Sequence, residues 1–243
     1  MEIWRDIVVF LAGAAIVAVT WLLVEHFILQ PRRKRNLIRR DTNRTALAAQ
    51  ARVSQIDDPF VLVTGDSTVS QLLLGPVSDL AVIDIAFPGL ASHEFADRIG
   101  TIMAAPRAVT RPLVTVLSVG ANDALQRDLT SEADRAGFLE TIERIAGIVA
   151  GSQATMILSL PRIDPSSAYA HRSVTMDRLN EDLRAFALRR NWIFFDCAVA
   201  LSDATLPADQ ITSDGLHLSP RAAGTLARAL RQKLRALVSS AAG

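Results

Sequence analysis

Five short apolar runs, separated by longer amphipathic stretches, constrain the fold of this chain more than any other feature. Each run is apolar at consecutive positions, which is typical of a strand buried on both faces of a parallel sheet. The runs lie at Val61 to Thr64, Leu80 to Ala86, Leu113 to Val119, Thr155 to Leu160 and Trp192 to Phe195. They predict five parallel strands.

The stretches between the runs favour helices. Glu132 to Ala150 and Val174 to Arg189 place apolar residues three and four positions apart, so that one face of each helix is apolar. Ser219-Pro220 before Ala222 to Val238 matches an N-cap followed by proline at the first helical position. The alternation of strands and helices predicts a three-layer α/β/α domain with a flavodoxin-like open sheet.

Four groups of polar or glycine residues follow these predicted strands or precede the last helix. Open parallel sheets present such residues together at their carboxyl edge. The groups are Gly65-Asp66-Ser67, Pro88-Gly89, Gly120-Ala121-Asn122-Asp123 and Asp214-Gly215-Leu216-His217. A serine at the tip of a buried strand, together with a histidine three residues after an aspartate, indicates a nucleophilic hydrolase. Taken alone, Ser67 would instead suit an N-cap of the helix that follows it.

The four groups, in this order, resemble the SGNH hydrolases, also called the GDSL esterase/lipase family. The resemblance covers Phe60 to the C-terminus. It implies that Ser67 is the nucleophile and that Asp214 and His217 complete a catalytic triad. It also implies an oxyanion hole made by the backbone N–H groups of Ser67 and Gly89 and the side chain of Asn122. Two loops depart from the family pattern, since Thr68 replaces a leucine, and Asp84 and Ala86 stand where Asn and Gly are common.

The resemblance implies a serine esterase or acyl hydrolase that needs no cofactor and no metal. The expected substrates are carboxylic esters or thioesters, which include short-chain acyl esters, lysophospholipids and O-acetylated glycans. The alternative is a catalytically silent, membrane-tethered binding or scaffold protein on the same fold. A formal net charge of +1 gives no basic field for nucleic acid, so we expect no nucleic-acid partner. The single cysteine, Cys197, is expected to be an inert core residue.

The N-terminus predicts a single membrane-spanning helix. From Ile7 to Leu29 the chain is almost entirely apolar, which is long enough to cross a hydrocarbon core of roughly 30 Å. A cleavable signal peptide is the alternative, but the chain lacks a positive n-region and a small-residue cleavage site. The sequence therefore predicts a membrane anchor at residues 1–30, a basic flank and helical spacer at 31–58, and a catalytic domain at 59–243.

Six positive residues lie between Arg32 and Arg40, directly after the predicted span. Short flanks rich in Lys and Arg stay in the cytoplasm, so the charge rule places the catalytic domain on the cytoplasmic side of the cell membrane. A periplasmic or extracellular domain is the alternative, because many membrane-tethered or exported members of the family that the chain resembles act on envelope lipids or sugars outside the cytoplasm. The same basic run could contact anionic lipid head groups.

Overall fold

The computed structural model describes residues 19–23, 25–26, 30–104, 111–204 and 206–241 of the chain. The chain divides into two compact units, Met1–Arg44 and Thr45–Gly243. In the first unit, Val19, Trp21, Leu22 and Leu23 are exposed. Most of the predicted span, at residues 7–18, 24 and 27–29, lies outside the described residues. Among the residues that are described, none belongs to a helix with the length and apolar character needed to cross a membrane.

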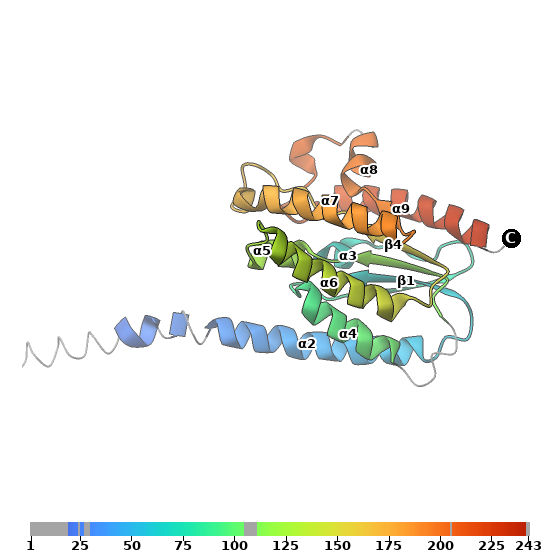
Figure 1. Ribbon diagram of the computed structural model, residues 1–243, viewed down its shortest axis with the longest axis horizontal. Coiled ribbons are helices and arrows are strands. Elements are labelled where there is room, and N and C mark those ends of the chain that lie inside the picture. Colours follow the sequence, from blue (N-terminus) through green and yellow to red (C-terminus); the bar gives the residue numbers. More distant parts are fainter. Residues whose placement is uncertain (1–18, 24, 27–29, 105–110, 205, 242–243) are drawn as a thin grey trace, which may run out of the picture. The chain divides into compact units, whose positions relative to one another are not determined.

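The second unit is built on a five-stranded parallel sheet, as predicted (Figure 1). Its spatial order is β2-β1-β3-β4-β5. The strands are β1 (Phe60–Gly65), β2 (Ala81–Ala86), β3 (Val114–Ser118), β4 (Ala154–Leu158) and β5 (Ile193–Phe195). The order reverses next to β1, and this switch point is where open α/β sheets form their ligand-binding crevice.

Helices cover both faces of this sheet (Figure 1). The unit contains α3 (Ser67–Gln71), α4 (Ser92–Met103), α5 (Ala121–Gln126), α6 (Glu132–Val149), α7 (Ser173–Arg189), α8 (Cys197–Asp203) and α9 (Pro220–Ala241), with short 3-10 turns η2 (Ala170–Arg172) and η3 (Ala208–Gln210). The predicted helices at α6, α7 and α9 are confirmed. As expected, Ser219 caps α9, since its Oγ accepts the N–H of Ala222 at 3.1 Å.

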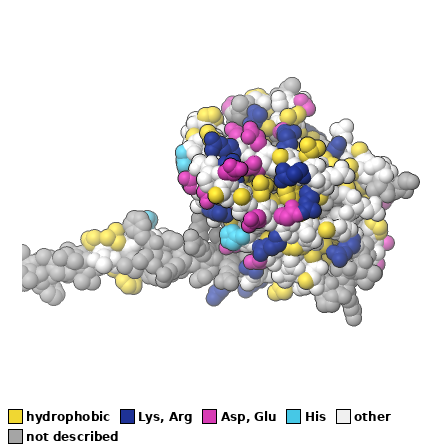
Figure 2. Space-filling model, viewed as in Figure 1, with side chains coloured by type: hydrophobic (Ala, Val, Ile, Leu, Met, Phe, Trp, Pro, Cys, Tyr) yellow, Lys and Arg dark blue, Asp and Glu magenta, His cyan; other side chains and the backbone are white. Residues whose placement is uncertain are grey.

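The two faces of the sheet have separate cores because side chains alternate along each strand. Val63 of β1, Val116 of β3 and Leu158 of β4 pack with Leu226 and Leu230 of α9 in one core. Leu62, Leu117 and Ile157 alternate with these residues and are also fully buried. Figure 2 shows acidic and basic side chains intermixed on one face of the molecule. The ion pairs Arg135–Asp182 and Arg144–Asp97 join α6 to the neighbouring helices α7 and α4.

The edge strands differ from the predicted pattern. We expected all five strands to be buried on both faces, but Ala81 and Asp84 of β2 are exposed, and all three residues of β5 are only partly buried. The reason is position, because β2 and β5 each have a single neighbouring strand. An apolar run does not by itself distinguish an edge strand from a central one.

Packing of the second unit begins before the predicted boundary at residue 59. Helix α2 (Gln30–Val53) forms in the predicted spacer region, and its last turns belong to the second unit. Ala46, Ala49 and Val53 are buried there, and the side chain of Gln50 donates to the Thr101 carbonyl at 3.1 Å. These residues recur at spacings of three and four, so one side of the helix end is apolar and packs on the unit.

Candidate functional site

Strand register brings three of the predicted site segments to one level. Gly65, the last residue of β1, pairs with Ala86 of β2 and with Ser118 of β3. The loops that leave these strands therefore emerge next to one another at the carboxyl edge. They line a cavity of about 260 Å³, which we call the site cavity. Its lining includes Ser67, Gly89, Asn122 and His217.

Ser67 begins the short helix α3 but does not cap it. The cap is Asp66, whose Oδ1 accepts the N–H of Thr68 at 2.9 Å. The Asp66 carboxyl is 2% exposed, and this burial raises its pKa above the usual range. Because a neighbour performs the capping, the hydroxyl of Ser67 is left available for another partner. The capping interpretation of Ser67 is therefore wrong, and Asp66 braces the loop.

His217 and Asp214 form a hydrogen-bonded pair. Nδ1 of His217 lies 2.7 Å from Oδ2 of Asp214. The other carboxylate oxygen accepts the backbone N–H groups of Leu216 at 3.1 Å and His217 at 2.8 Å. The hydrogen bond from the His217 side chain is the main reason that the pKa of Asp214 falls to about 2. The carboxylate thus stays ionised above about pH 4, and it favours the imidazole tautomer that carries its proton on Nδ1.

The loop that carries this pair requires glycine at position 215. Gly215 has φ of 85°, a conformation that L side chains rarely adopt. A Cβ atom there would lie 2.1 Å from the Cβ of Ser167. The Gly215 carbonyl also accepts the N–H of Asp164 at 2.9 Å. The loop after β4 therefore packs closely against the histidine loop and restrains it.

Asn122 presents an amide nitrogen that has no partner among the described residues. Its Nδ2 atom is buried, and no hydrogen-bond acceptor in the described part of the chain reaches it. Leaving a buried N–H unsatisfied costs about 1–3 kcal/mol. Because Asn122 lines the same cavity as Ser67 and His217, this donor is suited to an acceptor supplied by a bound molecule.

Hydrogen bonds join the segment that carries Asn122 to the segment that carries Gly89. Asp123 accepts two hydrogen bonds from Ser92, one from its N–H at 2.7 Å and one from its Oγ at 2.8 Å. Burial raises the pKa of Asp123. Gln126 donates to the Gly89 carbonyl at 3.1 Å, and Gly89 has a positive φ of 81°. These contacts orient the backbone of the loop after β2.

One residue that the sequence analysis did not identify connects the two halves of the site. Gln71 donates from Nε2 to the Leu218 carbonyl and accepts the Leu218 N–H at Oε1, both at 3.2 Å. It lies on α3 four residues after Ser67, and Leu218 directly follows His217. Its spacing of one helical turn from the serine was the signal available in the sequence.

The loop after β4 also flanks the site, through Pro161 and Tyr169, and His171 near its end is exposed. Cys197 is 5% exposed and begins α8, and burial raises the pKa of its thiol to about 12, as expected for an inert cysteine. In the part of the chain that the structure describes, no group of three His, Cys, Asp or Glu residues is placed to hold a metal ion.

Comparison with solved structures confirms the fold. A protein from Streptococcus pneumonia, named provisionally as a platelet activating factor, matches with a TM-score of 0.66 at 18% identity, covering 85% of this chain and 98% of that one. The lipase/acylhydrolase from Enterococcus faecalis matches with a TM-score of 0.59 at 20% identity, covering 74% and 96%. Est24, a carbohydrate acetylesterase from Sinorhizobium meliloti, matches with a TM-score of 0.56 at 15% identity, covering 74% and 100%.

At these identities the structural likeness concerns the fold alone, and none of the curated proteins matches this chain. The family is established by sequence. The model of the GDSL-like Lipase/Acylhydrolase family matches residues 63–224, which is well over half of the chain. The matched segment begins within β1 and ends within α9, so it contains all four groups around the site cavity. The chain therefore belongs to the GDSL-like lipase/acylhydrolase family and is an ester-bond hydrolase.

Proposed function

We propose that Ser67, His217 and Asp214 form the catalytic triad of this hydrolase and that Ser67, Gly89 and Asn122 form its oxyanion hole. The observation that carries the proposal is the buried, unpartnered amide nitrogen of Asn122 in the same cavity as Ser67 and His217. An oxyanion hole needs such a preorganised donor, because the charge that it stabilises develops only as the ester carbonyl is attacked.

The proposed reaction has two stages. His217 takes the proton of the Ser67 hydroxyl through Nε2 as the serine oxygen attacks the ester carbonyl. Its imidazolium then returns that proton to the alcohol or thiol, which leaves an acyl group on Ser67. In the second stage, His217 activates a water molecule that releases the acid. Asp214 keeps the imidazole oriented and stabilises its protonated form, as the 2.7 Å contact between the two side chains allows.

The proposed substrates are carboxylic esters or thioesters, with short-chain acyl esters, lysophospholipids and O-acetylated glycans as the candidates. Est24 is described as a carbohydrate acetylesterase, which supports acetyl esters as a first choice for assays. We favour an active enzyme over a silent scaffold, because the family model matches this chain and the site cavity is lined by Ser67, Asn122 and His217 together.

The dependence of the rate on pH tests this mechanism. We expect kcat/KM for p-nitrophenyl acetate, corrected for spontaneous hydrolysis, to rise with pH between about pH 5 and 8, because the base must be a neutral imidazole. Asp214 does not account for this rise, since its pKa of about 2 keeps it ionised throughout the range. A flat profile between about pH 5 and 8 would argue against His217 as the base.

Replacing Gln71 by alanine is expected to lower kcat about tenfold with little change in KM. The change removes both hydrogen bonds that join the helix of Ser67 to the backbone beside His217, and small errors in alignment are costly in catalysis. Steady-state kinetics measures the effect. Gln50→Ala is the matched control, because Gln50 also donates to a backbone carbonyl but lies on α2. A change in thermal stability without a change in kcat would assign Gln71 a structural role only.

We further propose that residues 7–29 anchor the protein in the cell membrane and that the basic residues 32–40 keep the hydrolase domain on the cytoplasmic side. The apolar segment before Pro31 and the six positive residues after it support this arrangement. Contact of the basic residues with anionic lipid head groups would add to the attachment.

Two fusions to the C-terminus test the orientation. A reporter that is active only in the cytoplasm is expected to be active, and a reporter that is active only after export is expected to be silent. The opposite result would place the domain outside the cytoplasm and favour an envelope lipid or glycan as substrate. Recovery of the full chain in the soluble fraction without detergent would contradict the anchor itself.

A further inference from the structure

A second cavity lies next to the site cavity and is lined mainly by apolar side chains. It has a volume of about 190 Å³, and we call it the α8 cavity. Its lining includes Leu160, Cys197, Leu201, Ile211, Leu218 and Leu226. A cavity of about 150 Å³ with a similar lining binds a six-carbon molecule such as benzene. The α8 cavity therefore has room for a chain of about six carbons.

The α8 cavity adjoins the proposed nucleophile. It shares Thr68, Pro161 and Leu218 with the site cavity. Thr68 directly follows Ser67, and Leu218 directly follows His217. The same two backbone segments that carry the proposed nucleophile and base thus form the wall common to both cavities. To reach the α8 cavity, a chain attached to the carbonyl carbon at Ser67 would extend past these shared residues.

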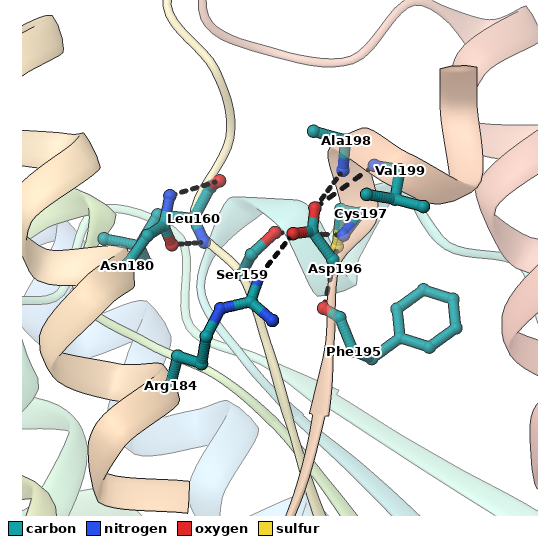
Figure 3. Close-up of polar contacts among 9 residues, drawn as sticks. All are labelled: Ser159, Leu160, Asn180, Arg184, Phe195, Asp196, Cys197, Ala198 and Val199. Atoms are coloured by element: carbon teal, nitrogen blue, oxygen red, sulfur yellow. Dashed lines mark hydrogen bonds and ion pairs between the residues drawn. The ribbon is translucent and has the colours of Figure 1, made fainter. Parts of the chain in front are cut away.

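Hydrogen bonds fix one side of the α8 cavity before any ligand binds (Figure 3). Asp196 caps α8, since its Oδ1 accepts the N–H groups of Ala198 and Val199 at 3.1 Å each, and Arg184 donates to its Oδ2 at 2.6 Å. The N–H of Cys197 donates to Oγ of Ser159 at 3.0 Å. These contacts hold the first turn of α8 in place, which limits the ordering that binding would require.

Two further hydrogen bonds fix the end of the neighbouring strand. Leu160 exchanges two hydrogen bonds with the side chain of Asn180, its N–H donating at 2.6 Å and its carbonyl accepting at 3.3 Å (Figure 3). The backbone polar groups of Leu160 are therefore satisfied away from the cavity. The Cys197 thiol stays neutral because burial raises its pKa to about 12, so it acts as one more apolar wall group.

The acyl part of an ester suits this cavity better than the alcohol part. The alcohol must take a proton from His217 and then leave, and the side chain of His217 is 38% exposed, which gives it access to solvent. The acyl group stays bonded to Ser67 until water releases it. An apolar cavity beside the serine can hold this chain through both stages, and burying each methylene strengthens binding by roughly fourfold.

We propose that the α8 cavity binds the acyl chain of the substrate and that the protein prefers esters of medium-chain acids, of about six carbons, over acetyl esters. This inference rests on the proposed role of Ser67. It narrows the substrate class to esters or thioesters of acids that carry an apolar chain of about this size.

A series of p-nitrophenyl esters from acetate to dodecanoate tests the inference on the full chain. Because the leaving group is constant, kcat/KM reports the acyl chain alone. We expect kcat/KM to increase up to about six carbons, where four more buried methylenes raise it above that for acetate by roughly 250-fold, and to decrease for longer chains. A maximum at acetate would overturn the inference but leave the proposed esterase intact, whereas no hydrolysis of any ester would contradict the proposed function itself.

Two variants on α8 test whether the α8 cavity causes the expected preference for longer acyl chains. Ala198→Phe adds volume to the cavity lining and is expected to lower the hexanoate-to-acetate ratio of kcat/KM at least tenfold. Val199→Phe is the matched control, because Val199 is the next residue on the helix but is 52% exposed, and its ratio is expected to stay within about twofold of the native value. Equal ratios in the two variants would overturn the assignment.

Ile211→Ala provides a second route if Ala198→Phe does not fold. Ile211 lines the cavity and is only partly buried, and its truncation is expected to move the preferred acyl chain to a greater length. Acetyl esters of alcohols from ethanol to octanol complete the test. If kcat/KM depends on chain length in this alcohol series and not in the acyl series, the cavity holds the leaving group and the inference is wrong.

Discussion

Replacing Ser67 by alanine is expected to lower ester hydrolysis by a factor on the order of 10⁴ to 10⁶, because the reaction loses its nucleophile. The domain is expected to remain folded, since Asp66 rather than Ser67 caps α3 and alanine is a good helix former. Initial rates with a p-nitrophenyl ester and a thermal unfolding curve measure the two effects separately.

Ser70→Ala is the matched control for this variant. Ser70 lies on the same short helix, and its hydroxyl donates to the Ser67 carbonyl at 2.7 Å without facing the site cavity. Its removal is expected to leave most of the activity. An unchanged rate in a preparation of Ser67→Ala that is free of native enzyme would show that Ser67 is not the nucleophile.

Replacing Asn122 by alanine is expected to lower kcat by about 100-fold to 1,000-fold with a smaller change in KM. The amide nitrogen of Asn122 has no acceptor among the described residues, so we expect it to bind the oxyanion that develops during attack. Removing a group that acts only in the transition state lowers kcat and kcat/KM together.

Asn122→Asp separates the hydrogen bond from the shape of the side chain. It preserves the size of the residue, replaces the donor by an acceptor and adds a negative charge where the oxyanion would form. We expect a loss at least as large as that of Asn122→Ala. Values of kcat within about threefold of the native enzyme in both variants would show that Asn122 does not stabilise the transition state.

The strand and helix predictions were confirmed for the central, buried strands and for the longer helices. The central strands β1, β3 and β4 lie at the predicted apolar runs, α6 and α7 form where apolar residues recur three and four positions apart, and α9 begins at the predicted Ser219-Pro220. The exposure of Asp84 in β2 was not predicted, because edge position depends on strand order, which periodicity does not contain. Helix α8 was also missed, since seven residues span too few turns for a periodic signal.

The candidate residues of the site could be named from short motifs, but their arrangement could not. No sequence feature showed that Asp66 rather than Ser67 caps α3, because both residue types favour that position. The contact between Gln71 and Leu218 joins positions 147 residues apart, and the α8 cavity combines side chains from the loop after β4, from α8 and from α9. Such contacts depend on how the layers pack, which local patterns do not specify.

The most direct test of the central claim is labelling with a fluorophosphonate probe, followed by identification of the modified peptide. Only a serine activated by a base reacts readily with such a probe. We expect labelling of the native protein at Ser67, loss of labelling in Ser67→Ala, and strongly reduced labelling in His217→Gln. Absence of labelling in folded native protein, or labelling at another serine, would contradict the assignment of Ser67 as the nucleophile.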